Sequence, residues 1–324
     1  MKAVMYHYVQ PTPQAWPAVG CLDVKDFTQQ LDYLLSIGRV PTQEEFLRAV
    51  RDRRVIDGAL VLTFDDGLVD HFRYVLPELE KRDLWGVFYV SSGVYLNRRL
   101  LNVHRVHAIL GAVGAQAALS LAIRLLPSDS ASFGYQREIL EGTYQTQAAD
   151  AAVQLKRLLN FYGEPEWRAQ LLDRMMAEIF ERESDLVDSF YLRLEELRTM
   201  TDCGMLIGNH TESHPCLKGL SYEEQFREII GAFEFLDCEL GGIPVRTFCY
   251  PYGGRVSYDS TTLSILEESN CLFSFSVEAR AVRDEDLRNR PHELPRYDCN
   301  SFPHGEFKSA SHSGWGRMSG RSIG

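Results

Sequence analysis

The sequence has no apolar run of about eighteen residues, the length that a helix needs to cross a membrane. It also has no basic run, and its formal net charge of −11 at pH 7 argues against a surface that holds a nucleic acid. The first residues, Met1 to Tyr8, lack the apolar core and cleavage site of a signal peptide and have the pattern of a first strand. We therefore expect a cytoplasmic protein with no transmembrane segment and no nucleic-acid partner.

Paired cysteines are also missing. The seven cysteines are scattered, and none has C-x-x-C spacing, so their odd number favours free thiols in a reducing compartment over a disulfide framework. Cys216 and Cys249 lie beside residues that we interpret below as a site, where a thiol could be a ligand or a nucleophile. A small buried hydrophobe is the ordinary role of a free cysteine and the alternative for both.

The sequence does have enough apolar residues, 45%, for one large domain or for one domain with an insertion. Strand patterns alternate with helical patterns in the first part of the chain and again in the last part, which predicts an α/β fold with a parallel sheet. Capping boxes, Thr42 with Glu45 and Ser221 with Glu224, predict the starts of two of the helices.

The stretch from Ala59 to Gly67 is a run of β-forming residues that ends in two carboxylates and a glycine. It predicts a buried parallel strand that delivers Asp65 and Asp66 to its C-terminal edge, where α/β folds keep their chemistry. Two ionised carboxylates side by side repel each other, so such a pair needs a cation or a shared proton. The simpler alternative is a strand that stops at an Asp-Gly turn.

Two further stretches follow apolar runs later in the chain. The first, Ile207 to Pro215, contains His210 and His214, and two histidines four residues apart can bind one metal ion together with an upstream aspartate. The second, Arg246 to Gly254, contains a Tyr-Pro-Tyr-Gly-Gly sequence at another expected strand end.

These three stretches, in this order, resemble the motifs of the polysaccharide deacetylases, carbohydrate esterase family four, also called the NodB homology domain. The first motif is similar to Thr63–Gly67, the second to His210–His214 and the third to Phe248–Gly253. The resemblance implies a distorted (β/α) barrel of the NodB type with a helical insertion. It also implies a metal-dependent carbohydrate N-deacetylase, which is a hydrolase of linear amides.

The predicted boundaries divide the chain into four parts: the first half of the barrel in 1–96, a helical insertion in 97–190, the second half of the barrel in 191–304, and a Ser/Gly-rich flexible tail in 305–324. In the insertion, strand signals vanish and helical periodicities recur. Because it leaves the sheet just after a strand end, we expect it to lie over the catalytic face, where it could form a lid or a substrate wall. A subdomain that supports only folding or dimerisation is the alternative. Its His104 and His107 are expected to be core or solvated residues.

Asp66, His210 and His214 offer one carboxylate and two imidazoles, the ligand count of a catalytic zinc site with one position open for water. A divalent cation lowers the pKa of such a water and polarises a nearby carbonyl, so we predict amide hydrolysis by metal-bound water. Zinc is the expected ion, and cobalt, nickel or iron also suit these ligands. The resemblance implies that Asp65 is the general base and that the backbone N–H of Tyr252 stabilises the oxyanion.

A general acid must protonate the departing amine, and the late Leu-x-His motif that many family members use for this step is not found. His7 lies in a stretch that resembles the poly-N-acetylglucosamine deacetylase branch, in which an N-terminal histidine takes this part. A half-buried structural histidine is the alternative for His7. His292 is the other candidate for the acid, and His304 lies in an expected loop.

The chain departs from the family pattern at two points. Cys249 stands where many members have an arginine that orients the base, and we interpret Arg296 as supplying that charge from the last predicted strand. A surface ion pair is the alternative for Arg296. The Asp-x-x-Asp motif that tunes the late histidine is not evident, and both departures agree with an acid supplied by His7.

The predicted function is removal of an N-acetyl group from an amino sugar. The expected cytoplasmic location favours a free, nucleotide-linked or lipid-linked precursor over a finished cell-wall polymer. Deformylation or O-deacetylation of a sugar precursor is the nearest alternative. A catalytically inactive carbohydrate-binding relative and a metal-free amidohydrolase are disfavoured, because neither needs a base beside a metal ligand.

Overall fold

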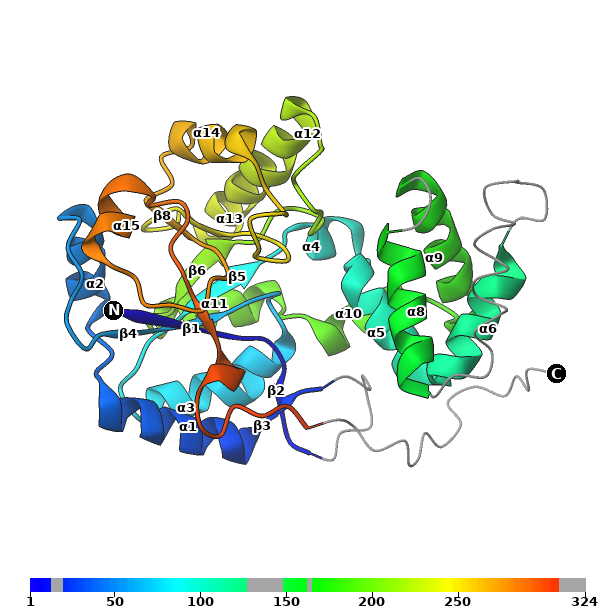
Figure 1. Ribbon diagram of the computed structural model, residues 1–324, viewed down its shortest axis with the longest axis horizontal. Coiled ribbons are helices and arrows are strands. Elements are labelled where there is room, and N and C mark those ends of the chain that lie inside the picture. Colours follow the sequence, from blue (N-terminus) through cyan, green and yellow to red (C-terminus); the bar gives the residue numbers. More distant parts are fainter. Residues whose placement is uncertain (13–19, 127–147, 162–164, 309–324) are drawn as a thin grey trace. The chain divides into compact units, whose positions relative to one another are not determined.

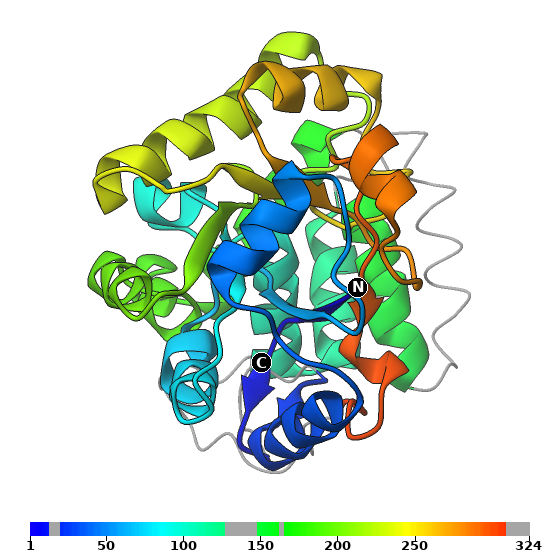
Figure 2. The same cartoon turned by 90° about the vertical axis from the view of Figure 1, so that its left-hand side faces the viewer.

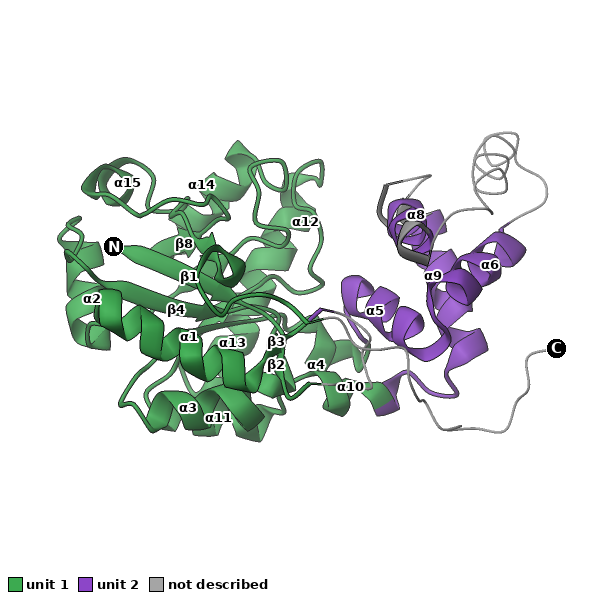
Figure 3. Cartoon of the chain, turned by 60° about the horizontal axis from the view of Figure 1, so that its bottom comes forward, with its two compact units in different colours: residues 1–12, 21–99, 186–308 green, residues 13–20, 100–185, 309–324 purple. Residues whose placement is uncertain are grey.

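The computed structural model describes residues 1–12, 20–126, 148–161 and 165–308 (Figure 1). The chain forms two compact units, which we call the barrel unit and the helical unit (Figure 3). Of the described residues, the barrel unit contains 1–12, 21–99 and 186–308, and the helical unit contains 100–126, 148–161 and 165–185.

The barrel unit is built on one sheet of seven strands in the order β8-β7-β6-β5-β4-β1-β9, with all neighbours parallel. The strands are β1 (Lys2–Tyr6), β4 (Leu60–Phe64), β5 (Val87–Val90), β6 (Leu206–Asn209), β7 (Thr247–Cys249), β8 (Phe273–Phe275) and β9 (Tyr297–Asp298). Two short strands, β2 (Val9–Gln10) and β3 (Leu22–Asp23), pair separately. The curled parallel sheet confirms the predicted α/β barrel fold.

Helices surround this sheet, as the turned view shows (Figure 2). They are α1 (Val24–Ile37), α2 (Gln43–Arg51), α3 (Leu76–Glu80), α4 (Gly93–Asn97), α11 (Leu194–Asp202), α12 (Tyr222–Phe226), α13 (Ala232–Leu240), α14 (Ser260–Glu268) and α15 (Asp284–Asn289). Two π-helical segments, η1 (His71–Val75) and η2 (Arg227–Gly231), precede α3 and α13, and a short 3-10 helix, η3 (Cys299–Ser301), follows β9. Both predicted capping boxes are present, at the starts of α2 and α12.

An aromatic stack in the core sets the register of the central strands. Tyr6 stacks on Phe64 and Phe64 stacks on Phe88, with ring centroids 5.1 and 4.6 Å apart. The same residues are paired across β1, β4 and β5. His7 and Asp65, which follow Tyr6 and Phe64, therefore leave adjacent strands at the same level of the sheet.

The helical unit contains α5 (Asn102–Val113), α6 (Ala115–Leu125), α8 (Ala148–Phe161), α9 (Pro165–Ile179) and the start of α10 (Ser184–Phe190). Its interior includes Leu155 and Met175, which are fully buried, and Arg105, which forms salt bridges with Asp173 and Glu183. His104 is fully buried on α5. The placement of this unit over the catalytic face stays a prediction.

The barrel unit extends beyond residue 304. Gly305 packs so closely on the carbonyl of Cys299 that a Cβ at this position would lie 1.9 Å from the oxygen. Lys308 then pairs antiparallel with Cys21 through two backbone hydrogen bonds. Of the predicted flexible tail, residues 309–324 lie outside the described residues.

A search of the described ranges for membrane spans finds no single helix of sufficient length and apolarity. The pair α5 and α6, bent by 115°, meets the length and composition test only when the two are taken together.

Candidate metal centre and active site

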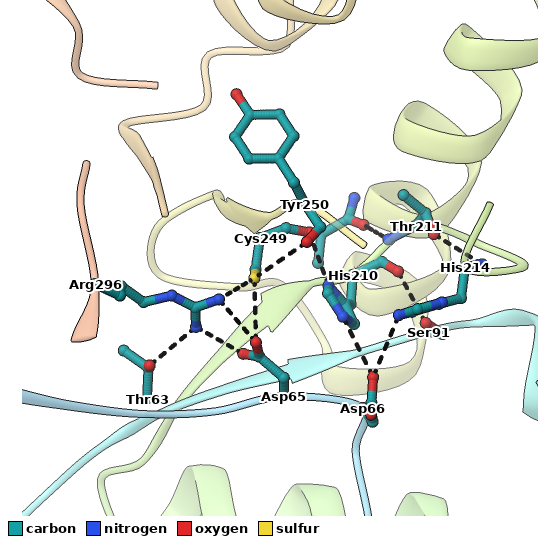
Figure 4. A network of polar contacts seen from close by, with 11 residues as sticks. Thr63, Asp65, Asp66, Ser91, His210, Thr211, His214, Cys249, Tyr250 and Arg296 are labelled. Atoms are coloured by element: carbon teal, nitrogen blue, oxygen red, sulfur yellow. Dashed lines mark hydrogen bonds and ion pairs between the residues drawn. The ribbon is translucent and has the colours of Figure 1, made fainter. Parts of the chain in front are cut away.

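The candidate metal centre and active site lie at the carboxyl ends of the parallel strands (Figure 4). Asp65 and Asp66 follow β4, His210 follows β6, and Cys249 is the last residue of β7. Arg296 is the exception, because it directly precedes β9 and reaches Asp65 with its side chain from the amino end of that strand. Because all these strands run in one direction, residues from opposite halves of the chain meet at one edge of the sheet.

Asp66, His210 and His214 converge on one point. Their ligand atoms all lie within 4.8 Å of one another, and all three residues are buried. The Nε2 atoms of His210 and His214 lie 3.3 and 3.5 Å from Oδ1 of Asp66. The Nδ1–H of His210 donates to the carbonyl of Cys249 at 2.7 Å, which turns the Nε2 lone pair towards the other two residues. One carboxylate and two imidazoles fit a divalent cation such as zinc.

Backbone strain is concentrated at this point of the barrel. Asp66, Thr211, His214 and Tyr252 all have positive φ, at 74°, 66°, 60° and 62°. Such a conformation costs a non-glycine residue about 1–3 kcal/mol and persists only where neighbouring contacts hold it. Two of those contacts are hydrogen bonds, from the N–H of Thr211 to Asn209 and from the N–H of His214 to the Thr211 hydroxyl. Strain of this kind indicates a functional site.

Asp65 has a different environment from its neighbour Asp66. Its two oxygens accept hydrogen bonds from Nη1 and Nη2 of Arg296, both at 2.8 Å, and Arg296 also donates to the Thr63 hydroxyl at 2.9 Å. Arg296 is fully buried, so this is not a surface ion pair. Burial would raise the pKa of Asp65, but the Arg296 guanidinium outweighs it and lowers the pKa to about 2. Asp65 is therefore ionised at neutral pH.

Cys249 lies against this ion pair. Its sulfur is 2.8 Å from Nη2 of Arg296 and 3.4 Å from Oδ2 of Asp65. Together with Asp65 and His210 it forms a second group whose ligand atoms lie within 4.8 Å of one another. Burial raises the pKa of the Cys249 thiol, and Arg296 already engages both oxygens of Asp65. The group with Asp66 is therefore the better cation site. Cys216, by contrast, is exposed.

His7 is half-buried at the end of β1, and its backbone is held by a residue that the sequence analysis missed. Nε2 of His71, in η1, donates to the carbonyl of His7 at 3.0 Å. The His71 ring is fully buried beside Phe64 and Phe88, with ring centroids 5.5 and 5.7 Å away. Burial lowers the pKa of His71 to about 4, so it is neutral and can donate from only one nitrogen. A histidine in a helix gives no sequence signal of this role.

His292, the other candidate for the general acid, contacts the opposite face of β8. Its Nδ1 lies 3.3 Å from the hydroxyl of Ser274, and its carbonyl accepts a hydrogen bond from Tyr250. Phe275, the residue that follows Ser274 on β8, places its ring 5.7 Å from the Arg296 guanidinium. Adjacent residues on a strand point to opposite faces, so Ser274 and His292 lie on the side of β8 away from Arg296. His304 is exposed in a turn.

Tyr252 lies beside the metal centre. Its ring packs edge-on against His214, with centroids 5.1 Å apart, and 55% of the residue is exposed. The next residue, Gly253, accepts a backbone hydrogen bond from Val277, and a Cβ on Gly253 would lie 2.2 Å from the Val277 side chain. Glycine is therefore required here for the loop after β7 to approach the loop after β8.

The fold and the site define a parallel β/α barrel with a candidate Asp/His/His cation centre and a second, ionised aspartate beside it. The family model described as "Polysaccharide deacetylase" matches residues 174–272, which include the second motif and the third. The match agrees with the resemblance that the three motifs predicted, and it supports the predicted class of enzyme, a carbohydrate N-deacetylase. The search of the curated proteins finds no match.

Several solved structures share the fold over nearly the whole chain. The Streptococcus pyogenes deacetylase PplD in complex with acetate is 18% identical, with 92% of this chain and 91% of that chain covered and a TM-score of 0.56. IcaB from Ammonifex degensii is 19% identical, with 91% and 89% covered and a TM-score of 0.54. A de-N-acetylase from Aggregatibacter actinomycetemcomitans is 12% identical, with 91% and 93% covered and a TM-score of 0.51. At these identities the likeness establishes the fold.

Proposed function

We propose that this protein hydrolyses the N-acetyl group of an amino sugar or of a sugar-containing precursor, and that it needs a divalent metal ion to do so. The proposal rests on the observation that Asp65 and Asp66 have different partners. One carboxylate belongs to a cation centre with two imidazoles, and the other is held ionised next to it by a buried arginine. The match to the polysaccharide deacetylase model supports a carbohydrate as the substrate.

Asp66, His210 and His214 would hold the metal ion, and zinc suits this donor set best. Once bound, the ion would polarise the amide carbonyl of the substrate and lower the pKa of a water molecule at the site. The hydrogen bond from His210 to the carbonyl of Cys249 fixes the tautomer that leaves Nε2 unprotonated for this purpose.

Asp65 acts as the general base. It is ionised because Arg296 stabilises its charge, and the two bonds to the guanidinium fix the plane of the carboxylate. A proton that Asp65 takes from the attacking water weakens this pairing, so Asp65 returns the proton readily. Arg296 thus orients the base and limits how long it stays protonated.

His7 acts as the general acid that protonates the departing amine. It follows β1 at the level where Asp65 follows β4. Tyr252, whose ring packs on His214, would direct its backbone N–H to the oxyanion that develops on the former amide carbonyl.

The substrate that we propose is a free, nucleotide-linked or lipid-linked amino sugar, because a cytoplasmic location remains our expectation for this chain. A formyl group on the same nitrogen, or an O-linked acetyl group, would require the same base and the same cation. A carbohydrate-binding relative without turnover is disfavoured by the buried Asp65–Arg296 pair, because binding alone does not require an oriented, ionised carboxylate beside the cation centre.

The test is release of acetate from N-acetylglucosamine-type substrates by zinc-loaded protein, with the metal content measured in each sample. We expect Asp65→Asn to retain zinc and lose at least about 100-fold in rate, because general acid–base catalysis contributes about 10²–10⁴-fold. If Asp65→Asn released acetate at the wild-type rate, Asp65 would not be the general base. Wild-type protein that binds zinc but releases neither acetate nor formate from any sugar would overturn the proposed activity.

A further inference from the structure

The loop that carries both imidazoles of the cation centre is short and strained. It runs from His210 to His214, and two of its five residues, Thr211 and His214, have positive φ. A left-handed backbone at non-glycine residues needs contacts from outside to hold it. The groups that hold this loop therefore determine where the two imidazoles lie.

One such group is the carboxylate of Glu228, in the π-helical segment η2. It accepts a hydrogen bond from the backbone N–H of Ser213 at 2.8 Å and another from the Ser213 hydroxyl. Ser213 is the residue directly before His214. The two oxygens of the Glu228 carboxylate each accept one of these bonds, so they match the one N–H donor and the one O–H donor of Ser213.

The backbone of η2 holds the same loop. The carbonyl of Glu228 accepts the N–H of Glu212 at 3.0 Å, and the carbonyl of Ile229 accepts the side-chain amide of Asn209 at 2.7 Å. Asn209 lies directly before His210. Two consecutive residues of η2 therefore contact the chain on both sides of His210. π-Helical turns occur often at functional sites.

We propose that Glu228 is a positioning residue for the cation centre. Its carboxylate holds Ser213 in place and thereby keeps His214 close to His210 and Asp66 before a metal ion binds. This inference rests on the metal dependence proposed above. Partners that act behind the ligands of a metal site change metal affinity when they are removed, because the ligands must then be ordered at the moment of binding.

The experiment measures the zinc affinity of purified full-length protein by competition with a chromophoric chelator, in the absence of any sugar. We expect Glu228→Ala to weaken zinc binding by about 10-fold or more, the lower end of the range for such partners. Glu228→Gln keeps one carbonyl acceptor for the Ser213 N–H and should recover most of the affinity. Glu223→Ala, which removes an exposed carboxylate from the adjoining α12, is the matched control and should bind zinc like the wild type.

A second readout separates positioning from general support of the fold. Cobalt replaces zinc in the same measurement, and its visible absorption bands report the geometry of the ligands. We expect altered bands in Glu228→Ala and wild-type bands in Glu228→Gln and Glu223→Ala. If Glu228→Ala does not fold, Ser213→Ala removes only the hydroxyl donor and should weaken zinc binding by a smaller factor in the same direction.

The inference is overturned if folded Glu228→Ala has the zinc affinity and the cobalt bands of the wild type. If Glu228→Ala does not fold, the same result in Ser213→Ala overturns it. Wild-type protein that binds neither metal would overturn both this inference and the proposed metal dependence. If the wild type binds zinc and Glu228→Ala binds it weakly, but no sugar is deacetylated, the proposed reaction fails and the positioning role stands.

Discussion

Asp65 and Asp66 are neighbours in the sequence, yet the protein gives them opposite partners. Asp66 faces the two imidazoles of the cation centre, and Asp65 is paired with the buried guanidinium of Arg296. A strand turns successive side chains to opposite faces, and the positive φ of Asp66 strengthens that separation just after the strand ends. Asp65 can therefore stay ionised beside a second carboxylate, because the guanidinium of Arg296 stabilises its charge.

The first prediction concerns the Asp65–Arg296 pair. Arg296→Ala should lower the free energy of unfolding by about 3–5 kcal/mol, because it leaves Asp65 as a buried charge without its partner. The double variant Arg296→Ala with Asp65→Asn should recover part of this loss, since it removes the stranded charge. Denaturant unfolding at pH 7 measures both.

The matched control is Arg198→Ala, which breaks an exposed salt bridge to Glu239. It should change stability by less than about 1 kcal/mol. A loss in Arg296→Ala that is no larger than the loss in Arg198→Ala would contradict the buried pairing.

The second prediction concerns Asp70, at the start of η1. It is buried, accepts one hydrogen bond from Gln10 at 3.1 Å, and its Oδ2 has no hydrogen-bond partner among the described residues. Burial raises the pKa of Asp70 to about 7, against about 3.9 for an unperturbed aspartate. A carboxyl whose pKa is raised by folding stabilises the folded state below its unfolded pKa and loses that contribution as pH rises through its folded pKa.

Wild-type stability should therefore fall between about pH 4 and pH 7 by the contribution of Asp70. Asp70→Asn stays neutral and can still accept the hydrogen bond from Gln10, so it should lack this part of the decline. Its stability relative to the wild type should therefore be greater at pH 8 than at pH 5. Denaturant unfolding at the two pH values provides the measurement. An identical difference between the two proteins at both values would show that Asp70 is ionised throughout.

At the scale of elements, the two π-helical segments have parallel roles. Each follows a strand and loop that carry site residues, and each supplies a side chain that bonds to the backbone of a site segment. In η1 this side chain is His71, which holds the carbonyl of His7, and in η2 it is Glu228, which holds Ser213. Regular helices close their hydrogen bonds internally, so interrupted turns offer more groups to neighbouring loops.

The third prediction tests η1. His71→Phe keeps an aromatic ring between Phe64 and Phe88 but removes the donor to the carbonyl of His7. Steady-state kinetics on the proposed substrate class should show a kcat lower by about 10- to 100-fold with little change in KM, because small misplacements of a catalytic group have effects of this size. Zinc content should equal that of the wild type. A wild-type kcat in a folded His71→Phe protein would show that the bond does not position the acid.

At the scale of the whole molecule, the helical unit begins and ends at neighbouring points. The backbone N–H of Leu100 donates to the carboxylate of Glu183 at 2.8 Å, within that unit. In the barrel unit, Arg98 and Asp188 form a two-pronged salt bridge at 2.7 and 3.0 Å. The unit can therefore be removed and the barrel chain rejoined by a short flexible linker between residues 99 and 186.

The fourth prediction uses this deletion. The barrel should still fold and bind zinc with wild-type affinity, because the cation centre and the residues that hold it belong to the barrel unit. If the helical unit forms a substrate wall, one of the two roles that the sequence leaves open, KM for the sugar should rise by more than about 10-fold while the zinc affinity stays constant. An unchanged KM in the deletion protein would favour a role in folding or dimerisation only.

From the sequence alone we could predict the α/β class, the three motifs at strand ends, the two capping boxes and, through the family resemblance, the group of Asp66, His210 and His214. These features depend on local patterns, namely side-chain periodicity, caps and the residues that follow a strand, which neighbouring residues alone dictate. His210 and His214 could be paired from their spacing, and the choice of Asp66 over Asp65 as the third ligand came from the resemblance to the polysaccharide deacetylases.

The distant side chains that complete the site could be identified only in the folded protein. The Arg296–Asp65 pair spans 231 positions of the chain, and the sequence left a surface ion pair open for Arg296. His71, Glu228 and the turning of His292 away from Arg296 were likewise not predictable. Each depends on strand register and on which face of an element packs inward, and these are set by the summed packing of the whole core rather than by any local pattern.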